Sequence, residues 1–256
     1  ILHANPSYFQ IRLISASDNG MERVRVDRNG DRVLRVQGDD LQEKAHFSYV
    51  SGALKLRPGA TYLSRIVINH ERGAHAGLDQ PSVILATPVV DDAGHALGVV
   101  VINVDLNGVF ATLAADLPRD YQLFLANRHG DFLIHPDPTQ TFGFDKGRRV
   151  LMQDEFAQTR DVVDGKAGKL LIEVHDGRYT GAPVLATFTS NKLKVSGDEE
   201  RLTLGLAQPL SNVLAQADEL GRVVLQLVVA LALACLLLAV VVARAVTPPI
   251  NSMTTA

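Results

Sequence analysis

The sequence predicts an α+β protein in which two antiparallel sheets follow one another and a single long helix comes last. Three observations support this fold class. Short segments of alternating apolar and polar residues are separated by turns containing Asn, Asp and Gly, which is typical of antiparallel strands. The order of hairpin, helical segment and three strands occurs twice, at a spacing of about 110 residues, which indicates an internal repeat. Residues 223–243 form an unbroken apolar run.

The first copy contains a hairpin, a helix and further strands. Alternating segments on either side of Asp18-Asn19-Gly20 predict the hairpin. Asp40 is suited to cap a helix, because Leu41, Ala45 and later apolar residues recur on one side. Val- and Ile-rich runs around Gly94 predict central antiparallel strands. The predicted elements are strands 10–17, 22–28 and 32–36, helix 41–56, strand 61–69, a polar loop 70–81, strands 83–90 and 98–106, and a short helix 108–116 capped by Asn107.

The second copy repeats this order. A hairpin turn containing Gly130 corresponds to the turn containing Gly20, and both copies pass from a strand into a helix in similar sequence, INVDLNGVFATL and LGLAQPLSNVLA. The predicted elements are strands 121–126 and 132–135, an irregular segment 142–159 that is helical over 152–158, and strands 168–175, 183–189 and 201–208.

The apolar run from Val223 to Ala243 predicts a transmembrane helix. Gln226 is its one polar side chain, and at about 1.5 Å per residue its length matches a bilayer's hydrocarbon thickness. The alternative is a helix buried in a soluble core. Apolar residues at helical spacing over 210–222 predict that the helix extends outward as a stalk. Arg222 and Arg244 bracket the run, so charge does not orient it.

Residues 244–256, RAVTPPINSMTTA, resemble the beginning of a HAMP linker, the helical relay below the membrane in bacterial sensors. The alternative is an ordinary proline break after the membrane. The resemblance implies that residues 244–256 are cytoplasmic and residues 1–222 extracytoplasmic, and that the chain forms homodimers. The chain starts at Ile1 without a preceding membrane segment, so we expect it to be part of a longer protein.

Together, the two predicted sheets and the helix are similar to a double-Cache sensor, in which two PAS-like domains precede a membrane helix. The stretches that carry this resemblance are YFQIRLISASDNGMERVRVDR, GATYLSRIVINHERG, ATPVVDDAGHALGVVVINVD and FLANRHGDFLIHPDP. The resemblance implies a distal domain over 1–117, a proximal domain over 118–209, a stalk and membrane helix over 210–243, and the start of HAMP over 244–256. The expected role is small-molecule sensing and signal transduction in the bacterial inner membrane, as the sensory part of a histidine kinase. A diguanylate cyclase or chemoreceptor output stays open.

Composition and motifs argue against other functions. Net charge is −3 with dispersed basic residues, which does not indicate nucleic-acid binding. No nucleophile elbow or phosphate-binding glycine loop is present, so we expect no catalytic residues and no cofactor. His70 and His75 are five apart rather than four, which disfavours a zinc site. His135-Pro136-Asp137 at a strand end favours a turn with Asp137 bonded to backbone over a ligand site.

The resemblance implies a ligand pocket between the first sheet and the helix and loop that cover it. The residues predicted to line it are Tyr49, Tyr62, Ser64, Arg65 and Asp105. Arg65 is suited to bind a carboxylate and Asp105 to pair with an amine. The alternatives are that these two charges pair with each other or face water, and that the two tyrosines are core residues.

The ligand class remains open at this stage. Ser64 stands where the amino-acid-binding members of the double-Cache family have Asp, which disfavours an amino acid and leaves organic acids and other small solutes. A membrane-anchored envelope enzyme and a ligand-free adaptor that works through a partner protein are the other functional hypotheses.

Overall fold

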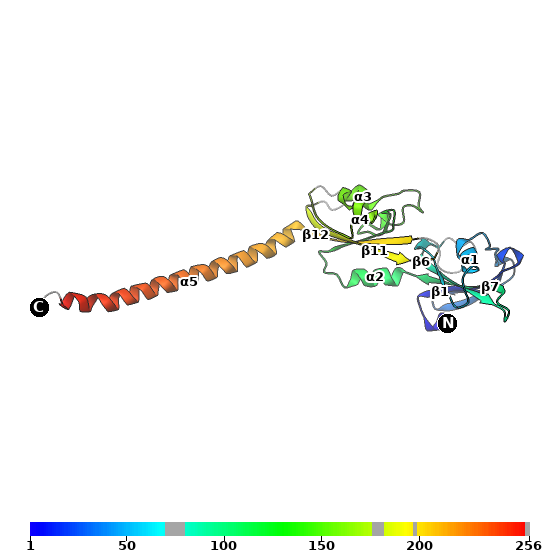
Figure 1. Ribbon diagram of the computed structural model, residues 1–256, viewed down its shortest axis with the longest axis horizontal. Coiled ribbons are helices and arrows are strands. Elements are labelled where there is room, and N and C mark those ends of the chain that lie inside the picture. The colour runs from blue at the N-terminus through cyan, green and yellow to red at the C-terminus, as the bar shows by residue number, and fades with distance from the viewer. Residues whose placement is uncertain (70–79, 176–181, 197–198, 254–256) are drawn as a thin grey trace. The chain divides into compact units, whose positions relative to one another are not determined.

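The structure is a computed structural model that describes residues 1–69, 80–175, 182–196 and 199–253. It contains two antiparallel sheets, and no strand belongs to both (Figure 1). The chain divides into two compact units, one formed by residues 1–172 and 186–207 and the other by residues 173–185 and 208–256. The predicted α+β class, with two sheets and a long final helix, is confirmed.

The first sheet has seven strands in the order β3-β2-β1-β7-β6-β4, and β5 pairs with β6. Helix α1, which is short, lies between β3 and β4 in sequence, and α2 follows β7. The bounds are β1 Tyr8–Ser15, β2 Glu22–Asn29, β3 Arg32–Val36, α1 Ser48–Ala53, β4 Tyr62–Leu63, β5 Val67–Ile68, β6 Pro81–Val90, β7 Ala96–Asp105 and α2 Asn107–Ala115.

The centre of this sheet forms where the sequence predicted it. Strands β6 and β7 pair antiparallel from Ser82↔Asp105 to Val90↔Ala96, and β1 pairs with the other edge of β7. Both β6 and β7 are rich in β-branched residues, which suit a half-buried pleated surface. The core on the α1 side of this sheet contains apolar residues from five elements: Ile14, Tyr49, Val50, Ala53, Tyr62, Ala86, Val99 and Val101.

The predicted helix over 41–56 is mostly wrong, because only Ser48–Ala53 is helical. Asp40 ends a 3₁₀ turn instead of capping a helix. The segment 42–45 forms backbone hydrogen bonds with the first hairpin: the Lys44 amide donates to the Gly20 carbonyl at 2.9 Å, and the Glu22 amide donates to the Gln42 carbonyl at 3.0 Å. These tertiary bonds satisfy the backbone outside a helix and outweigh a weak helical propensity.

The predicted strand over 61–69 is interrupted at Ser64, leaving β4 and β5 as two short strands on β6. The Ser64 hydroxyl accepts the Ile84 amide at 2.8 Å and donates to the Arg65 carbonyl at 2.7 Å. A side chain therefore replaces a backbone carbonyl in the ladder, which is a known way for serine to compete with regular structure. Of the predicted loop 70–81, residues 70–79 lie outside the described residues, and Pro81 begins β6.

The second sheet has five strands in the order β10-β11-β12-β8-β9. Its core contains four phenylalanine rings, Phe124, Phe132, Phe156 and Phe188, with successive ring centroids 5.0–5.9 Å apart. The predicted strands of this half are confirmed, with ends shifted by a few residues. The bounds are β8 Gln122–Ala126, β9 Phe132–Ile134, α3 Met152–Glu155, α4 Arg160–Val163, β10 Lys169–Val174, β11 Val184–Lys194 and β12 Glu199–Pro209.

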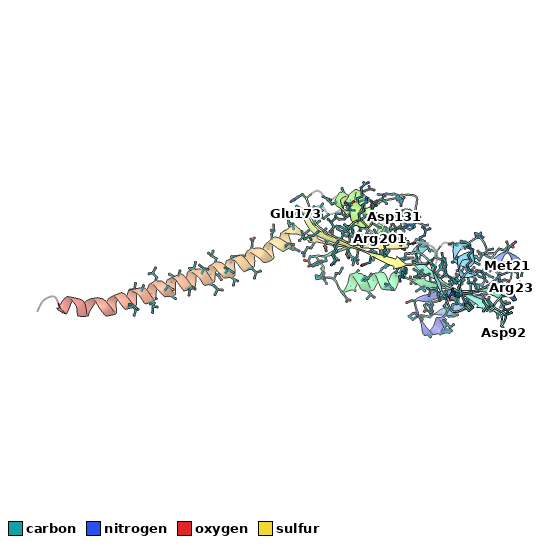
Figure 2. The ribbon with its side chains drawn as sticks, viewed as in Figure 1. Met21, Arg23, Asp92, Asp131, Glu173 and Arg201 are labelled. Atoms are coloured by element: carbon teal, nitrogen blue, oxygen red, sulfur yellow. The ribbon has the colours of Figure 1, made fainter. Side chains whose placement is uncertain are left out.

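The final helix α5 runs from Leu210 to Met253. Its segment Leu210–Val242 is long and apolar enough to cross a membrane, and its most apolar window is 0% buried. Apolar side chains project from all sides of α5 along this stretch (Figure 2). This exposure argues against the alternative of a helix buried in a soluble core. The helix continues through Pro248 and Pro249, so the alternative of an ordinary proline break after the membrane segment does not occur.

Candidate ligand-binding cavity

A cavity of about 800 Å³ opens on the α1 side of the seven-stranded sheet. This volume lies within the range of small-molecule sites, roughly 300–1,000 Å³. The walls come from the segment before α1, α1 itself, β4 and the residues that follow it, β6, and the two residues that follow β11. The lining residues are Gln42, Glu43, Lys44, His46, Phe47, Ser48, Tyr49, Ser51, Gly52, Lys55, Tyr62, Ser64, Arg65, Val67, Ile68, Asn69, Ser82, Ile84, Val195 and Ser196.

Four of the five residues predicted from the sequence line this cavity, namely Tyr49, Tyr62, Ser64 and Arg65. Asp105 does not line it. The chain leaves β7 for α2 at this position, and the Asp105 carboxylate accepts the Asn107 amide at 2.9 Å. Asp105 therefore accepts a backbone N–H at the start of α2, whereas the sequence predicted that Asn107 caps this helix. No ion pair joins Asp105 to Arg65 in the described part of the chain.

The two tyrosines line the cavity and also belong to the apolar core. Tyr62 is 9% exposed and its ring lies against Gly52 of α1, where an added Cβ would be 2.6 Å from Tyr62 Cε2. Tyr49 is 5% exposed, and its hydroxyl accepts a hydrogen bond from Arg12 Nη1 at 3.1 Å. The Arg12 guanidinium also lies 5.3 Å from the centre of the Tyr49 ring. Both rings are therefore held in fixed positions in the cavity wall.

Arg65 and Ser64 differ in how far they are committed to the fold. The Ser64 hydroxyl is engaged in the sheet ladder through Ile84 and Arg65. The Arg65 side chain is exposed at the cavity. Its fork of donors suits a carboxylate better than any other cavity group does.

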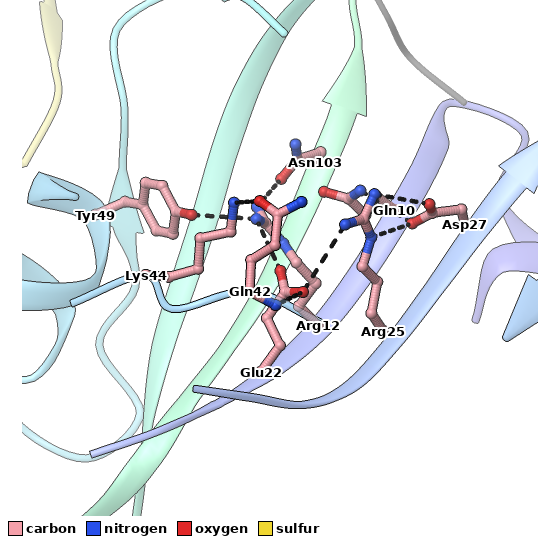
Figure 3. A network of polar contacts seen from close by, with 9 residues as sticks. All are labelled: Gln10, Arg12, Glu22, Arg25, Asp27, Gln42, Lys44, Tyr49 and Asn103. Atoms are coloured by element: carbon pink, nitrogen blue, oxygen red, sulfur yellow. Dashed lines mark hydrogen bonds and ion pairs between the residues drawn. The ribbon is translucent and has the colours of Figure 1, made fainter. Parts of the chain in front are cut away.

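Behind the cavity lies a buried polar network that sequence reasoning missed (Figure 3). Arg12 is its central residue. Its Nη2 donates to Asn103 Oδ1 at 2.8 Å, and its Nη1 lies 3.6 Å from Glu22 Oε1. Arg12 is 0% exposed and Glu22 is 1% exposed. The network reaches the cavity through Tyr49, which Arg12 contacts directly.

The outer part of the network lies between β1 and β2. Arg25 donates from Nε and Nη2 to the two carboxylate oxygens of Asp27, at 3.1 and 3.0 Å. Arg25 Nη1 also lies 3.8 Å from Glu22 Oε2, and Gln10 Nε2 donates to Asp27 Oδ1 at 2.9 Å. Arg25 and Asp27 are both fully buried. This bidentate geometry is the strongest form of arginine–carboxylate contact.

The segment before α1 closes the network on the cavity side. The Gln42 amide donates to Glu22 Oε2 at 3.1 Å, and Lys44 Nζ donates to Gln42 Oε1 at 2.8 Å. Lys44 is 2% exposed and also lies 5.1 Å from the centre of the Phe47 ring. Gln42 and Lys44 line the cavity, so the network and the cavity share these side chains.

One sequence signal could have revealed this network. Residues Gln10, Arg12 and Ile14 alternate along β1, as do Arg25 and Asp27 along β2, so charged residues occupy the same face as a core residue. Alternation alone predicts strands but does not say which face is buried. Here the face that carries the polar residues is the more buried one. The apolar residues Ile11 and Leu13 on the other face of β1 make the opposite assignment look more natural from the sequence.

The charges around the cavity are mostly positive. Among the described lining residues Lys44, Lys55 and Arg65 are cationic, and Glu43 is the acidic one. With histidine neutral, these groups give the described lining a net charge of about +2. Such a wall favours an anionic ligand over a cationic one.

The described residues contain no group of three His, Cys, Asp or Glu side chains that could hold a metal ion. His70, Glu71 and His75 lie outside the described residues. The turn predicted at His135-Pro136-Asp137 is confirmed. The Asp137 carboxylate accepts the Thr139 amide at 2.9 Å, and hydrogen bonds from Gln140 and Thr139 lower the pKa of Asp137 to about 2.

Near this turn, between the end of β9 and α3, is a buried pair that the sequence did not predict. His135 Nε2 lies 3.1 Å from Glu155 Oε2, and both side chains are at most 1% exposed. The His135 ring contacts Phe124 and Phe132 edge-on, at centroid distances of 5.3 and 4.7 Å. The pair is part of the aromatic core and does not line the cavity.

A family of known proteins matches the chain. The family model described as "Bacterial histidine kinase, sensor domain" matches residues 1–159. No curated protein matches the chain.

Solved structures match most of the chain in fold. The extracellular domain of vpHK1S-Z8, named as a histidine kinase, has a TM-score of 0.60 and 19% identity, covering 82% of this chain and 72% of its own. A domain of a Vibrio parahaemolyticus protein, named as a member of the sensory box/GGDEF family, has a TM-score of 0.61 and 20% identity, covering 82% and 75%. The periplasmic sensory domain of the Campylobacter jejuni chemoreceptor Tlp1 has a TM-score of 0.53 and 18% identity, covering 81% and 74%. These likenesses show the fold alone.

Proposed function

The chain belongs to the bacterial histidine kinase sensor-domain family, and we propose that it detects a small anionic solute outside the cell and signals through α5. The observation that carries this proposal is the cavity of about 800 Å³ with Arg65 exposed at its wall. A mostly apolar, concave site with few polar groups is the usual form of a small-molecule site. The predominance of Lys44, Lys55 and Arg65 over Glu43 favours an organic acid.

The proposed domain organisation follows the two sheets. Residues 1–117 form a membrane-distal Cache domain with the cavity, residues 118–209 form a proximal Cache domain, and residues 210–243 form the stalk and membrane helix. Support comes from the two separate sheets and from the apolar, unburied surface of α5. In this proposal residues 1–222 lie in the periplasm and residues 244–256 begin a cytoplasmic HAMP relay.

The proposed output is a histidine kinase of a two-component system in the inner membrane, acting as a homodimer. The family match supports this output over the others. The likeness in fold to domains of a GGDEF-family protein and of a chemoreceptor supports a diguanylate cyclase or a chemoreceptor as the second candidate. Sensor modules of one fold serve different outputs, because function is determined by the attached domains.

A thermal-shift screen tests the proposal. The full chain in detergent is heated with sodium salts of small carboxylates, including acetate, pyruvate, succinate and malate, and with matched amines and neutral sugars. At a concentration about 100 times its Kd, a ligand adds about 2.7 kcal/mol to the free energy of unfolding. For a chain of this size the midpoint then rises by roughly 5–11 °C. We expect such a rise with at least one carboxylate and none with the amines.

Two variants locate the ligand. Arg65→Ala is expected to remove the rise in midpoint while leaving the unliganded midpoint unchanged, because Arg65 is exposed and makes no contact needed for folding in the described part of the chain. Arg57→Ala removes an exposed arginine that does not line the cavity, and the rise is expected to persist. The proposal fails if no carboxylate raises the midpoint, or if Arg65→Ala and Arg57→Ala behave alike.

A further inference from the structure

One wall of the cavity comes from the segment that follows β11 of the second sheet. Val195 and Ser196 directly follow β11, and both line the cavity formed by elements of the first sheet. The two residues lie in the same compact unit as that sheet. A ligand in the cavity would therefore lie beside both the first sheet and the segment that joins β11 to β12 of the second sheet.

Ser196 is attached to the edge of the first sheet by hydrogen bonds in both directions. Its amide donates to the Leu63 carbonyl at 3.0 Å, and its hydroxyl accepts the Leu63 amide at 3.0 Å. A third, longer bond of 3.5 Å joins the hydroxyl to the Thr61 carbonyl. Strand β4 is the last strand in the sheet order, so its outer edge has no strand beside it in the described part of the chain. Ser196 thus acts as a one-residue strand on that edge.

Strand β4 is suited to respond to a ligand. It is two residues long, and a strand this short is weakly held by its own ladder. Tyr62 in β4 faces the cavity and packs on Gly52 of α1, so a ligand that touches either residue bears on β4. Because the interior around them is closely packed, a small displacement at Tyr62 is passed to neighbouring groups rather than absorbed.

Strand β12 leads directly into the final helix. Strand β12 spans Glu199–Pro209, and α5 begins at the next residue, Leu210. Ser196 is three residues before Glu199 in sequence, so a change in where β4 holds Ser196 is expected to displace the start of β12.

We propose that the segment Val195–Ser196 transmits the presence of a ligand in the cavity to the second sheet. Val195 contributes an apolar side chain to the cavity wall, and Ser196 holds the segment on β4. The proposal rests on the sensory function proposed above and specifies which contact makes the second sheet sensitive to the cavity. By linkage, loosening this contact alters ligand affinity by the same factor by which the ligand alters the contact.

A covalent occupant tests this without knowledge of the ligand. Cys235 is the one cysteine of the chain, so Cys235→Ser combined with Ser51→Cys leaves a single thiol at an exposed residue that lines the cavity. Benzyl methanethiosulfonate converts this thiol to a mixed disulfide and places a benzyl group at the cavity, and intact mass confirms complete labelling. Hydrogen exchange of β4 and β12 is then compared with and without the label.

The comparison is repeated in two serine variants. Ser196→Ala removes the acceptor of the Leu63 amide, so that amide is expected to exchange about fivefold faster, as for the loss of one hydrogen bond. Ser190→Ala is the matched control, because Ser190 lies in β11 and its hydroxyl contacts Thr203 rather than β4. We expect the label to change β12 exchange at least about threefold in the parent and in Ser190→Ala, and much less in Ser196→Ala.

Two results would overturn the inference. One is no change in β12 exchange on labelling of the parent. The other is an equal change in Ser196→Ala and in the parent. Either result leaves the carboxylate thermal shift untouched, so the failure of this inference is distinguishable from the failure of the proposed sensory function. Circular dichroism of each variant confirms that it is folded.

Discussion

Neutralising Glu22 is the most direct test of the buried network behind the cavity. Glu22→Gln keeps the shape of the side chain and an oxygen that can accept the Gln42 amide, but it removes the charge between Arg12 and Arg25. The carboxylate oxygens lie 3.6 and 3.8 Å from the two guanidinium nitrogens. At an effective dielectric constant of about 20, each attraction is about 4–5 kcal/mol.

The measured cost will be smaller than the sum of these attractions, because the substitution also relieves the burial of a charge. Removing one partner of a buried ion pair typically costs about 3–5 kcal/mol. For a chain of this size, that lowers the midpoint of thermal unfolding by roughly 6–20 °C. The assay is thermal unfolding of the full chain in detergent, followed by circular dichroism.

Glu199→Gln is the matched control. Its carboxylate side chain is 79% exposed and pairs with Lys192 at 3.1 Å, and such surface pairs contribute about 0–1 kcal/mol. If Glu22→Gln lowers the midpoint no more than Glu199→Gln does, the buried charges do not depend on one another and the reasoning is refuted.

Three further predictions follow. Gly98→Ala is expected to lower the free energy of unfolding by about 1–3 kcal/mol or more, because the new Cβ would lie 2.3 Å from the Ile14 carbonyl oxygen in the centre of the sheet. Gly108→Ala in α2 meets nothing within 4 Å and should raise it by about 0.5–1 kcal/mol. Urea unfolding of the two variants checks this contrast, and equal midpoints would contradict it. His135→Leu is expected to lower the free energy of unfolding by about 3–5 kcal/mol, because it leaves the Glu155 carboxylate buried without its imidazole partner. The double variant His135→Leu, Glu155→Met should recover part of this loss, and a double variant less stable than His135→Leu would show that the pair is not its cause. The lowered pKa of Asp137 contributes stability that is fully present above about pH 4, its ordinary value being 3.8, and that is lost as pH falls towards about 2; Asp137→Asn should flatten the stability profile in this window, and an unchanged slope would disprove the assignment.

Several elements were predictable because local sequence and tertiary structure agree. Strands β6 and β7 are rich in Val, Ile and other apolar residues on either side of a turn, and they pair with each other along their length. The long apolar segment of α5 was also predictable, because an apolar run of this length without charges is typical of a membrane-spanning helix with an apolar surface.

The helix over 41–56 failed for the opposite reason. Its apolar spacing is helical, but Lys44 and Gln42 are bonded to residues of the first hairpin at least twenty positions earlier in the chain. Periodicity within one window carries no information about such partners. Asp105 does not line the cavity for a related reason, since the sequence could not show that the chain turns into α2 there and engages its carboxylate.

The cavity was predictable in outline but not in its chemistry. Tyr49, Tyr62, Ser64 and Arg65 were assigned from a family resemblance that maps one strand and one helix onto the fold. Lys44 and the network around Arg12 were missed, because alternating polar residues on a strand usually face water. Ser196 was missed because it is more than one hundred residues away in sequence.

Four buried charged residues that contact one another limit which substitutions can accumulate in this sequence during evolution: Arg12, Glu22, Arg25 and Asp27. Replacing one of these four residues leaves an opposite charge buried without its partner. Replacing all four by apolar residues of similar volume, in contrast, can be tolerated. Relatives of this protein are therefore expected to hold either the whole quartet or none of it, so that these positions vary in concert rather than singly.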